Sequence, residues 1–165
     1  MAEPLTRADL QQFIDSHGID AGILPLNAHT ATVSDAARVL GVATGQIIKS
    51  LVFLNTGDPL LVINNGLARV DRKKLAVFLG VGRKRVKFAT AEQALAITGY
   101  VVGSMPPFGH RQKLPTLVDP AVTTQDTVYG GGGALDAMLR LTPAELLRIT
   151  AAEVVTVAEE EKTPL

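Results

Sequence analysis

The chain contains no cysteine and no tryptophan, and aromatic residues amount to only 4% of it. Without cysteine the protein has no disulfide bonds, no thiolate nucleophile and no cysteine-bound metal, which fits a reducing compartment. With so few aromatic rings, the core must be built from aliphatic side chains. No apolar run approaches the roughly 20 residues of a membrane span, and the start of the chain lacks the apolar centre of a signal peptide. We therefore expect a cytoplasmic protein that does not bind membranes.

Several catalytic motifs are also missing. The histidines His17, His29 and His110 are widely separated and form no His-x-x-x-His pattern, so we expect no metal site and no cofactor. No Gly-x-Ser-x-Gly sequence marks a serine nucleophile. The glycine run 130–133 is not followed by Gly-Lys-Ser/Thr, so it is not a phosphate-binding P-loop. A flexible turn is its simplest interpretation.

The chain is long enough for one domain with a substantial core, and we treat residues 1–165 as a single domain. Two apolar runs, 49–55 and 60–64, are joined by Thr56-Gly-Asp-Pro59 and predict a β-hairpin. Other short strands interleave with short helices, without the regular βαβ alternation of a parallel sheet. This pattern favours an α+β fold with a curled, barrel-like mixed sheet flanked by short helices.

Capping signals predict where helices begin. Thr6 followed by Asp9 has the spacing of a capping box and begins a helix over the next turns. Asp71 caps a second helix, in which the spacing of Leu75 and Phe78 predicts that both lie on the inner face.

The charge is unevenly distributed, although the formal net charge is zero. Eight of the sixteen lysine and arginine residues lie between positions 69 and 87, against the single acid Asp71. Such a segment can bind a polyanion, and it can equally be a solvated helix face followed by a polar turn. If it binds RNA, the contacts are expected from Arg72, Lys73, Arg83 and Lys84.

The stretch from Gly99 to His110 combines three further features: three glycines, two adjacent prolines and a terminal histidine. Glycine permits positive φ and close backbone approach, whereas proline fixes φ and donates no N–H. The loop is therefore shaped, and its few remaining N–H groups can be aimed at one point to bind an oxyanion or a phosphate. A tight turn between a helix and a strand is the alternative.

Lys49 lies at the start of an apolar strand. Its side chain either extends to solvent from the strand end or places an ammonium at the mouth of a pocket. In the second case, the ammonium and the loop N–H groups would together form an anion-receiving site that needs neither cysteine nor metal.

Four motifs follow one another along the chain: Ile-Lys-Ser-Leu-Val at 48–52, Gly-Tyr-x-x-Gly-x-x-Pro-Pro-Phe-Gly-His at 99–110, Leu-Pro-Thr-Leu-Val-Asp at 114–119, and the glycine run before Leu135-Asp136. In this order and spacing the chain resembles the YbaK/proline-tRNA-synthetase-associated family of aminoacyl-tRNA deacylases. The resemblance covers most of the chain. It implies an enzyme that hydrolyses the ester of mischarged tRNA, with alanine or cysteine on the proline tRNA as the expected substrates.

The resemblance also implies roles for individual residues. Lys49 matches the lysine that contacts the terminal adenosine or phosphate and the ester end of the substrate. Gly103 matches the glycine whose main chain helps to bind the reacting carbonyl, and water or a group of the substrate is the nucleophile. These two are the expected catalytic residues.

Further substrate contacts are expected around the same pocket. For His110, a hydrogen bond to the loop backbone is the alternative to proton transfer. Where some relatives have Ser-Gly-Gly this chain has Gly130-Gly-Gly, so any role of that hydroxyl is lost. The full set of expected substrate-binding residues is Tyr100, Ser104, Pro106, Phe108, His110, Gly131 and Asp136.

The expected partners are a mischarged tRNA and an aminoacyl-tRNA synthetase, with no DNA and with a monomeric or homodimeric chain. A non-catalytic adaptor of the same fold, binding an aminoacyl or nucleotide end, is the rival hypothesis. Such an adaptor would be expected to have lost Lys49 or the glycine loop, and this chain has both. An unrelated small-molecule binder would leave the basic segment unexplained.

Overall fold

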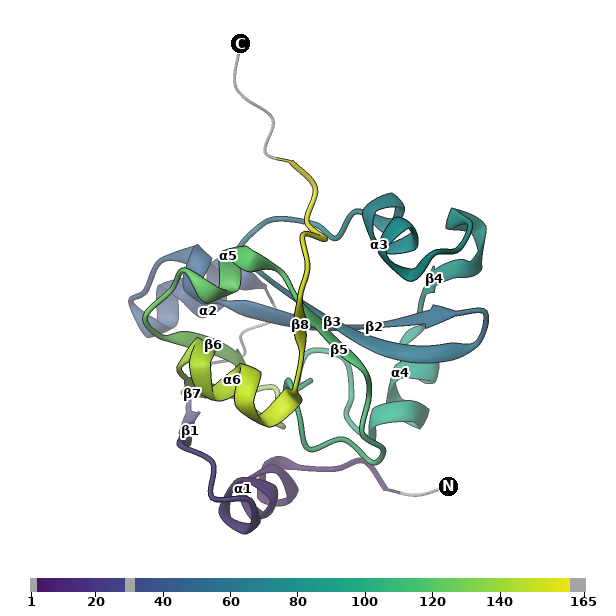
Figure 1. Cartoon of the computed structure of the whole chain (residues 1–165). Helices are drawn as coiled ribbons and strands as arrows, with labels where there is room; N and C mark the ends of the chain where they lie inside the picture. Colours follow the sequence, from purple (N-terminus) through teal and green to yellow (C-terminus); the bar gives the residue numbers. More distant parts are fainter. Residues whose placement is uncertain (1–2, 29–31, 161–165) are drawn as a thin grey trace.

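The computed structural model describes residues 3–28 and 32–160. In this part of the chain the helices are α1 (Arg7–Ser16), α2 (Val33–Leu40), α3 (Arg72–Leu79), α4 (Ala91–Thr98), α5 (Pro120–Thr123) and α6 (Pro143–Thr150), with 3-10 turns η1 (Thr44–Gln46) and η2 (Arg83–Arg85). The strands are β1 (Ala21–Pro25), β2 (Ile48–Asn55), β3 (Asp58–Asn65), β4 (Val86–Phe88), β5 (Thr116–Val118), β6 (Val128–Gly131), β7 (Ala137–Leu141) and β8 (Glu153–Val154) (Figure 1).

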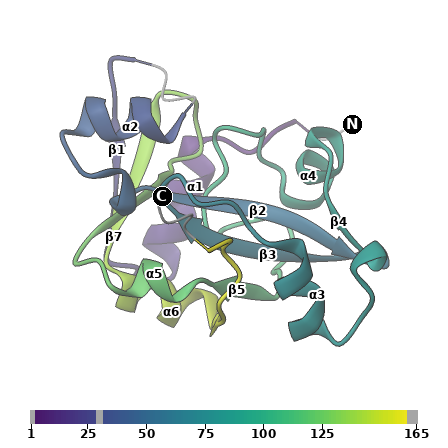
Figure 2. The same ribbon diagram turned by 90° about the horizontal axis from the view of Figure 1, so that it is seen from above.

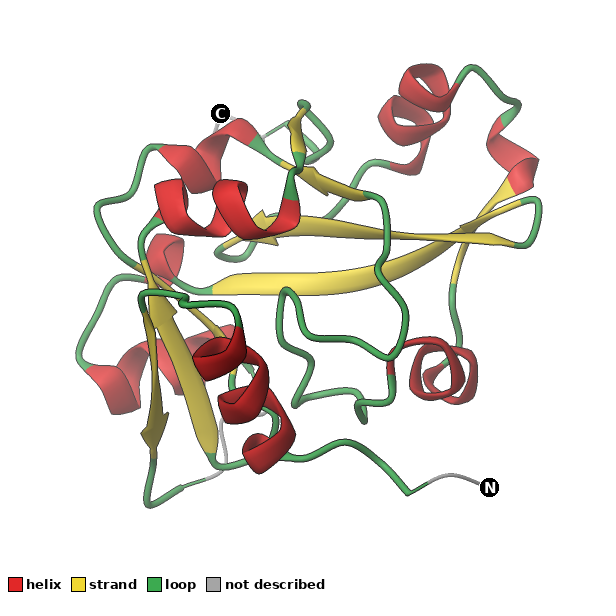
Figure 3. Cartoon of the chain, turned by 60° about the horizontal axis from the view of Figure 1, so that its bottom comes forward, coloured by secondary structure: helices red, strands yellow, loops and turns green. Residues whose placement is uncertain are grey.

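The described strands form two sheets. The larger one has the order β4-β2-β3-β5-β8, with β3, β5 and β8 parallel to one another in neighbouring pairs, and the smaller one is the antiparallel sheet β1-β7-β6. A single bridge between Ile47 and Tyr129 connects them, and the strands of the small sheet cross the direction of the β2–β3 hairpin (Figures 2 and 3). The predicted α+β class with a mixed sheet is confirmed. The expected barrel-like closure is wrong, because the strands separate into two sheets that do not close into a barrel.

The hairpin of β2 and β3 is the central element. The two strands pair over their full length, from Ile48 opposite Asn65 to Asn55 opposite Asp58. Thr56 and Gly57 make the turn with φ of 49° and 89°, as a tight two-residue hairpin requires. The predicted hairpin is therefore confirmed, although its turn is shorter than the predicted Thr56–Pro59.

Alternation of side chains along the hairpin divides the core into two layers. On one face, Ile48 and Val52 join the main cluster, which also contains Leu10, Leu139 and Leu146 from α1, β7 and α6. On the other face, Phe53, Leu60 and Val62 pack against Leu75 of α3 and Val157. The main cluster therefore lies between the hairpin and the small sheet.

The capping predictions are correct, and one packing prediction is wrong. Thr6 N–H bonds to Asp9 Oδ2 at 2.7 Å, and Asp71 Oδ1 accepts from the N–H groups of Lys73 and Lys74. Phe78, however, is 41% exposed. Helix α3 turns Leu75, Ala76 and Leu79 toward the core, a stripe that leaves Phe78 on its outer side.

Helix α5 was not predicted, although the signals were present in the sequence. Asp119 accepts a hydrogen bond from Ala121 N–H at 3.0 Å, and Pro120 occupies the first position of the helix. A helix of one turn is too short to show an apolar period, so only its cap could have revealed it.

Residues 3–28 and 32–160 contain neither a membrane span nor a metal-binding cluster. No helix there is long and apolar enough to cross a membrane, and no group of three or more His, Cys, Asp or Glu side chains is placed to hold a metal ion. Of the three histidines, His29 lies outside the described residues.

Candidate active site

A pocket of about 370 Å³ lies along the first half of β2. On one side β2 pairs with β3 throughout, but on the other side β4 pairs only with Phe53, Leu54 and Asn55. Among the described residues no strand covers the edge from Ile48 to Leu51, and these residues line the pocket. The chain leaves the sheet after β4 because Thr90 caps α4, accepting from Gln93 N–H at 3.1 Å. The pocket is thus built on an uncovered strand edge.

Lys49 contributes the charged group of this pocket. Its ammonium donates to the Ala68 carbonyl at 2.6 Å, and Asn64 Nδ2 donates to the same oxygen at 2.8 Å. The side chain is half-buried, and this burial, reinforced by the nearby Arg69 guanidinium, lowers the pKa of Lys49 below its usual 10.5. Lys49 is among the residues that line the pocket, and its ammonium is bound by the Ala68 carbonyl rather than extended freely into solvent.

The loop after α4 forms the facing wall, and Figure 3 shows it folding back beneath the hairpin. Ser104 N–H and Oγ both bond to the Val101 carbonyl, at 3.1 and 2.8 Å, which closes a tight turn. Gly103 sits in this turn with φ of 97° and lines the pocket. Its N–H makes no hydrogen bond with any residue that the structure describes. The loop is therefore both a tight turn and a wall of the pocket.

The predicted flexible turn at the glycine run 130–133 is wrong for the first two of its residues. Gly130 and Gly131 belong to β6 and are not part of a flexible turn. A Cβ on Gly131 would lie 2.0 Å from the Met105 carbonyl oxygen, and one on Gly132 would lie 2.7 Å from the Ala137 carbonyl carbon. Glycine is needed here because the backbone of β6 packs directly on the pocket loop. Gly131 lines the pocket, as predicted from its position.

The other predicted substrate-binding residues lie elsewhere. Tyr100 and Ser104 are buried, with 0% and 1% of their surfaces exposed, and Pro106 is buried in the loop. Asp136 is exposed and does not line the pocket, although its carbonyl accepts from Leu26 N–H at 2.7 Å. Phe108 and His110 line a second pocket on the other side of the loop.

His110 is tied to its own loop. One ring nitrogen, Nε2, lies 2.8 Å from the Pro106 carbonyl oxygen, and burial lowers the pKa of the imidazole. This contact supports the backbone hydrogen bond that the sequence left open as an alternative to proton transfer.

Sequence reasoning missed most of the pocket wall. Its remaining residues are apolar or small and come from α2, the hairpin, β4, α4, the loop after α4 and β7; they include Val33, Ala36, Ser50, Phe88, Ala91, Ala94, Met105 and Met138. Small alanines carry no chemical signal in a sequence. One sign in the sequence was available. Thr90, which caps α4, comes two residues after the end of β4, so β4 is too short to cover all of β2.

The four candidate tRNA-binding residues are all exposed, two on α3 and two on η2. Arg72 and Lys73 begin α3, and only Val70 and Asp71 separate this helix from Arg69. Arg69 in turn follows Ala68, whose carbonyl accepts from the Lys49 ammonium, so the basic segment begins next to this contact in the chain.

Tyr100→Phe tests whether Tyr100 is structural. Its hydroxyl is buried without a partner among the described residues, and burial, with a smaller effect of Asp9, raises the pKa of Tyr100 to about 12. Because an unsatisfied buried hydroxyl costs about 1–3 kcal/mol, we expect the variant to keep or raise the Tm in thermal unfolding. A clear fall in Tm would show that the hydroxyl has a partner that stabilises the fold.

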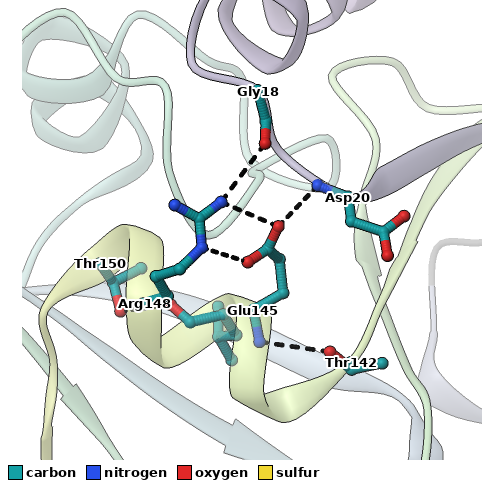
Figure 4. Close-up of polar contacts among 7 residues, drawn as sticks. Gly18, Asp20, Thr142, Glu145, Arg148 and Thr150 are labelled. Carbon is teal, nitrogen blue, oxygen red and sulfur yellow. Dashed lines mark hydrogen bonds and ion pairs between the residues drawn. The ribbon is translucent and has the colours of Figure 1, made fainter.

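The ion pair between Arg148, which lines the second pocket, and Glu145 connects α6 to the segment before β1 (Figure 4). Arg148 donates from Nε and Nη2 to the two Glu145 oxygens at 2.5 and 2.9 Å, and Nη2 also reaches the Gly18 carbonyl at 3.4 Å. Glu145 Oε2 accepts from Asp20 N–H at 2.6 Å. The bond from Arg148, followed by that from Asp20, lowers the pKa of Glu145 to about 2.

Glu145→Gln is therefore expected to lower the Tm at neutral pH and to flatten its acid dependence. A lowered carboxyl pKa stabilises the fold above the ordinary value of 4.5, and this stability is lost as the pH falls toward about 2. Thermal melts across that window would measure it. Asp35→Asn, in the looser 3.5 Å pair with Arg38, is the matched control and should change the acid slope less. Equal slopes in wild type and Glu145→Gln would contradict the prediction.

The fold and the pocket together define a class of protein: a mixed α+β domain whose pocket, at an uncovered strand edge, is lined by a lysine and a glycine-containing loop. Comparison with known families agrees, because the model for the aminoacyl-tRNA editing domain matches residues 27–149. The chain belongs to this family, which confirms the predicted enzyme class, an aminoacyl-tRNA deacylase that edits mischarged tRNA.

Three individual proteins are similar to this chain over most of its length. The chain is 31% identical to YwhH of Bacillus subtilis over 71% of its length and 73% of that protein. It is also 31% identical to the multifunctional Ser/Thr-tRNA deacylase ProXp-y of Escherichia coli K12, over 72% of this chain and 73% of the relative. It matches the proline–tRNA ligase of Thermodesulfovibrio yellowstonii with 28% identity, over 81% of this chain but only 23% of the ligase.

A solved structure shows the same fold. The crystal structure of a protein proposed to be a trans-editing enzyme for prolyl-tRNA synthetase superposes with a TM-score of 0.87 and 32% identity. The match covers 93% of this chain and 97% of that one.

Proposed function

We propose that residues 1–165 act as one freestanding editing domain, which removes a small amino acid from mischarged proline tRNA. The likeness to proline–tRNA ligases and to a prolyl trans-editing enzyme supports the choice of tRNA. The single observation that carries the proposed site is that Lys49 and Gly103 line one pocket at the uncovered edge of β2, and that the Gly103 N–H has no hydrogen-bond partner among the described residues.

In this proposal the two groups act by positioning and electrostatics. Water adds to the ester carbonyl and gives up a proton to solvent, and the Gly103 N–H stabilises the oxyanion that forms. When the oxyanion collapses, the bond to the tRNA ribose oxygen breaks, and this oxygen takes a proton from solvent to leave as a hydroxyl. The Lys49 ammonium, held in place by the Ala68 carbonyl, attracts the terminal phosphate or the ester end of the substrate. Because both groups are fixed before the reaction, little reorganisation accompanies the charge development.

The lining of the pocket supports an amino acid with an uncharged side chain. Ala36, Ala91 and Ala94 together with Val33 make this part of the wall apolar, so a charged side chain would lose its hydration there without a partner. We propose alanine or cysteine as the preferred residue, and the relative named for serine and threonine adds these two as competitors. A single methylene changes such a preference by only ~1–3 kcal/mol, so measurement must decide among them.

The test is deacylation of proline tRNA charged separately with alanine, cysteine, serine, threonine and proline. Release of one or more small residues with proline spared is the expected result. The adaptor hypothesis predicts binding of the same tRNA without release from any species. Release of proline at the same rate as alanine would contradict an editing role.

The basic segment provides a separate prediction about tRNA binding. Arg83 and Lys84 are exposed on η2, so replacing both with glutamine removes charge without disturbing packing. We expect weaker tRNA binding and a shallower dependence of log K on log salt, by about 0.9 for each duplex phosphate that is no longer neutralised. A filter-binding series in salt would measure the slope, with Arg38→Gln on α2 as the control. An unchanged slope would assign the segment to an ordinary solvated surface.

A synthetase partner and the oligomeric state belong to the same proposal. We propose that the chain works beside a prolyl-tRNA synthetase as a monomer or homodimer, since its relatives include parts of that synthetase. Size-exclusion chromatography of the chain with and without the synthetase would test both statements.

A further inference from the structure

The second pocket, of about 400 Å³, has no role in the reaction described above. It lies between α1, α6 and the segment Pro107–Leu114, whereas Gly103 and Met105 of the same loop line the first pocket. One loop thus separates the two pockets. The volume falls within the range of small-ligand sites, roughly 300–1,000 Å³.

The wall of this pocket contains a stack of three rings. The His17 and Phe13 rings are stacked with centroids 4.0 Å apart, and Phe13 stacks on Phe108 at 5.8 Å. Phe108 is buried, Phe13 is partly buried, and His17 at the end of the stack is exposed. In a chain with so few aromatic residues, this is an unusual concentration. A further planar ring can extend the stack at His17.

The charge of the pocket is positive. Two cationic side chains line it, Lys113 and Arg148, and none of its described lining residues is an acid. Arg148 is neutralised by Glu145, as Figure 4 shows. Lys113 is exposed and makes no hydrogen bond or ion pair with any residue that the structure describes. An anionic group bound here would therefore meet an available ammonium.

We propose that the second pocket binds a nucleotide, with the base stacked on His17 and the phosphate at Lys113. A ring platform accepts any base, because every base has a π-face, and a lysine supplies the charge for the phosphate. Two sources fit this chemistry: a free mononucleotide, or a nucleotide near the end of the RNA whose last residue occupies the first pocket. The second source rests on the proposed function, and the site itself does not.

The test uses the full ¹⁵N-labelled chain with two probes, CMP and the trinucleotide CCA. Amide shifts at His17, Gly109 and Lys113 report the second pocket, and those at Ser50 and Gly103 report the first. We expect saturable shifts at the second pocket. His17→Ala should weaken binding about tenfold or more, and His17→Phe should restore it, because stacking and not the imidazole nitrogen is required.

Lys113→Met should also weaken binding and should lower the salt slope by about 0.7, the value for one phosphate on a single strand. Arg38→Gln on α2, an exposed cation outside both pockets and outside the basic segment, is the control and should change neither quantity. His17 and Lys113 are both exposed, so these variants are expected to fold.

The two sources give different results. If the RNA end supplies the nucleotide, CCA binds more tightly than CMP, and Lys113→Met raises the KM of deacylation while leaving kcat unchanged. If a free nucleotide is the ligand, CMP and CCA bind equally and the kinetics do not change. Absence of shifts at His17, Gly109 and Lys113 with both probes at millimolar concentration would overturn the proposal. Because binding is read without deacylation, failure of the proposed function would leave this result interpretable.

Discussion

Lys49→Met is expected to reduce deacylation of mischarged tRNA by about 10²–10³, the usual cost of losing one donor from a preorganised electrostatic site. The same variant should keep or raise the Tm. Burial lowers the pKa of Lys49, which means that the fold disfavours its charged form, and removing the charge relieves that cost. The Ala68 carbonyl keeps its hydrogen bond from Asn64, so no acceptor is left without a partner.

This pairing of lost activity with retained stability separates a functional lysine from a structural one. Single-turnover deacylation and thermal melts of the same preparation would measure both quantities. Arg38→Gln on α2, an exposed cation outside both the pocket and the basic segment, is the control and should leave both unchanged. Near-normal turnover by Lys49→Met would remove the lysine from the mechanism.

Gly131→Ala is the second variant with a large expected effect. The added Cβ would overlap the Met105 carbonyl oxygen at 2.0 Å, and its three nearest atoms are all main chain. No side-chain rotation can relieve the overlap, so β6 or the pocket loop must move. Overpacking of this kind costs about 1–3 kcal/mol, which lowers the Tm of a chain of this size by several degrees.

Because Met105 lies two residues from Gly103, movement of the loop also displaces the proposed oxyanion donor. We expect deacylation to fall by at least the ~10² of a missing donor. Gly82→Ala is the control, since a Cβ there meets nothing within 4 Å and the backbone has ordinary negative φ. Wild-type rates in Gly131→Ala would show that the loop accommodates the methyl group without disturbing the site.

The parts of the fold that depend on local chemistry could be predicted from the sequence. The capping residues Thr6 and Asp71 bond to the first turn of their helices as expected, and alternating apolar runs identified the hairpin. Lys49, Gly103 and Gly131 were picked out by motif, and the structure brings all three to one pocket. Their catalytic and binding roles stay predictions.

The parts that depend on tertiary packing could not be predicted. Tyr100 and Phe108 belong to the same motif as Gly103, but a loop has two sides, and proximity in sequence does not say which side a residue faces. The division into two sheets depends on pairing between β1 and β7, which are more than a hundred residues apart. Phe78 was misplaced because a helix of two turns fits more than one apolar stripe.

The unequal lengths of β2 and β4 have a consequence for how this site can change. The opening in the sheet is as long as the difference between an eight-residue strand and a three-residue one, so its size is set by the point at which the chain turns into α4. A cap placed two residues later than Thr90 would let β4 extend as far as Ser50 and close much of the opening with ladder hydrogen bonds. Insertions and deletions before α4 would therefore change the length of the pocket opening one residue at a time. Substitutions of the lining residues would change only how well a substrate side chain packs against the wall.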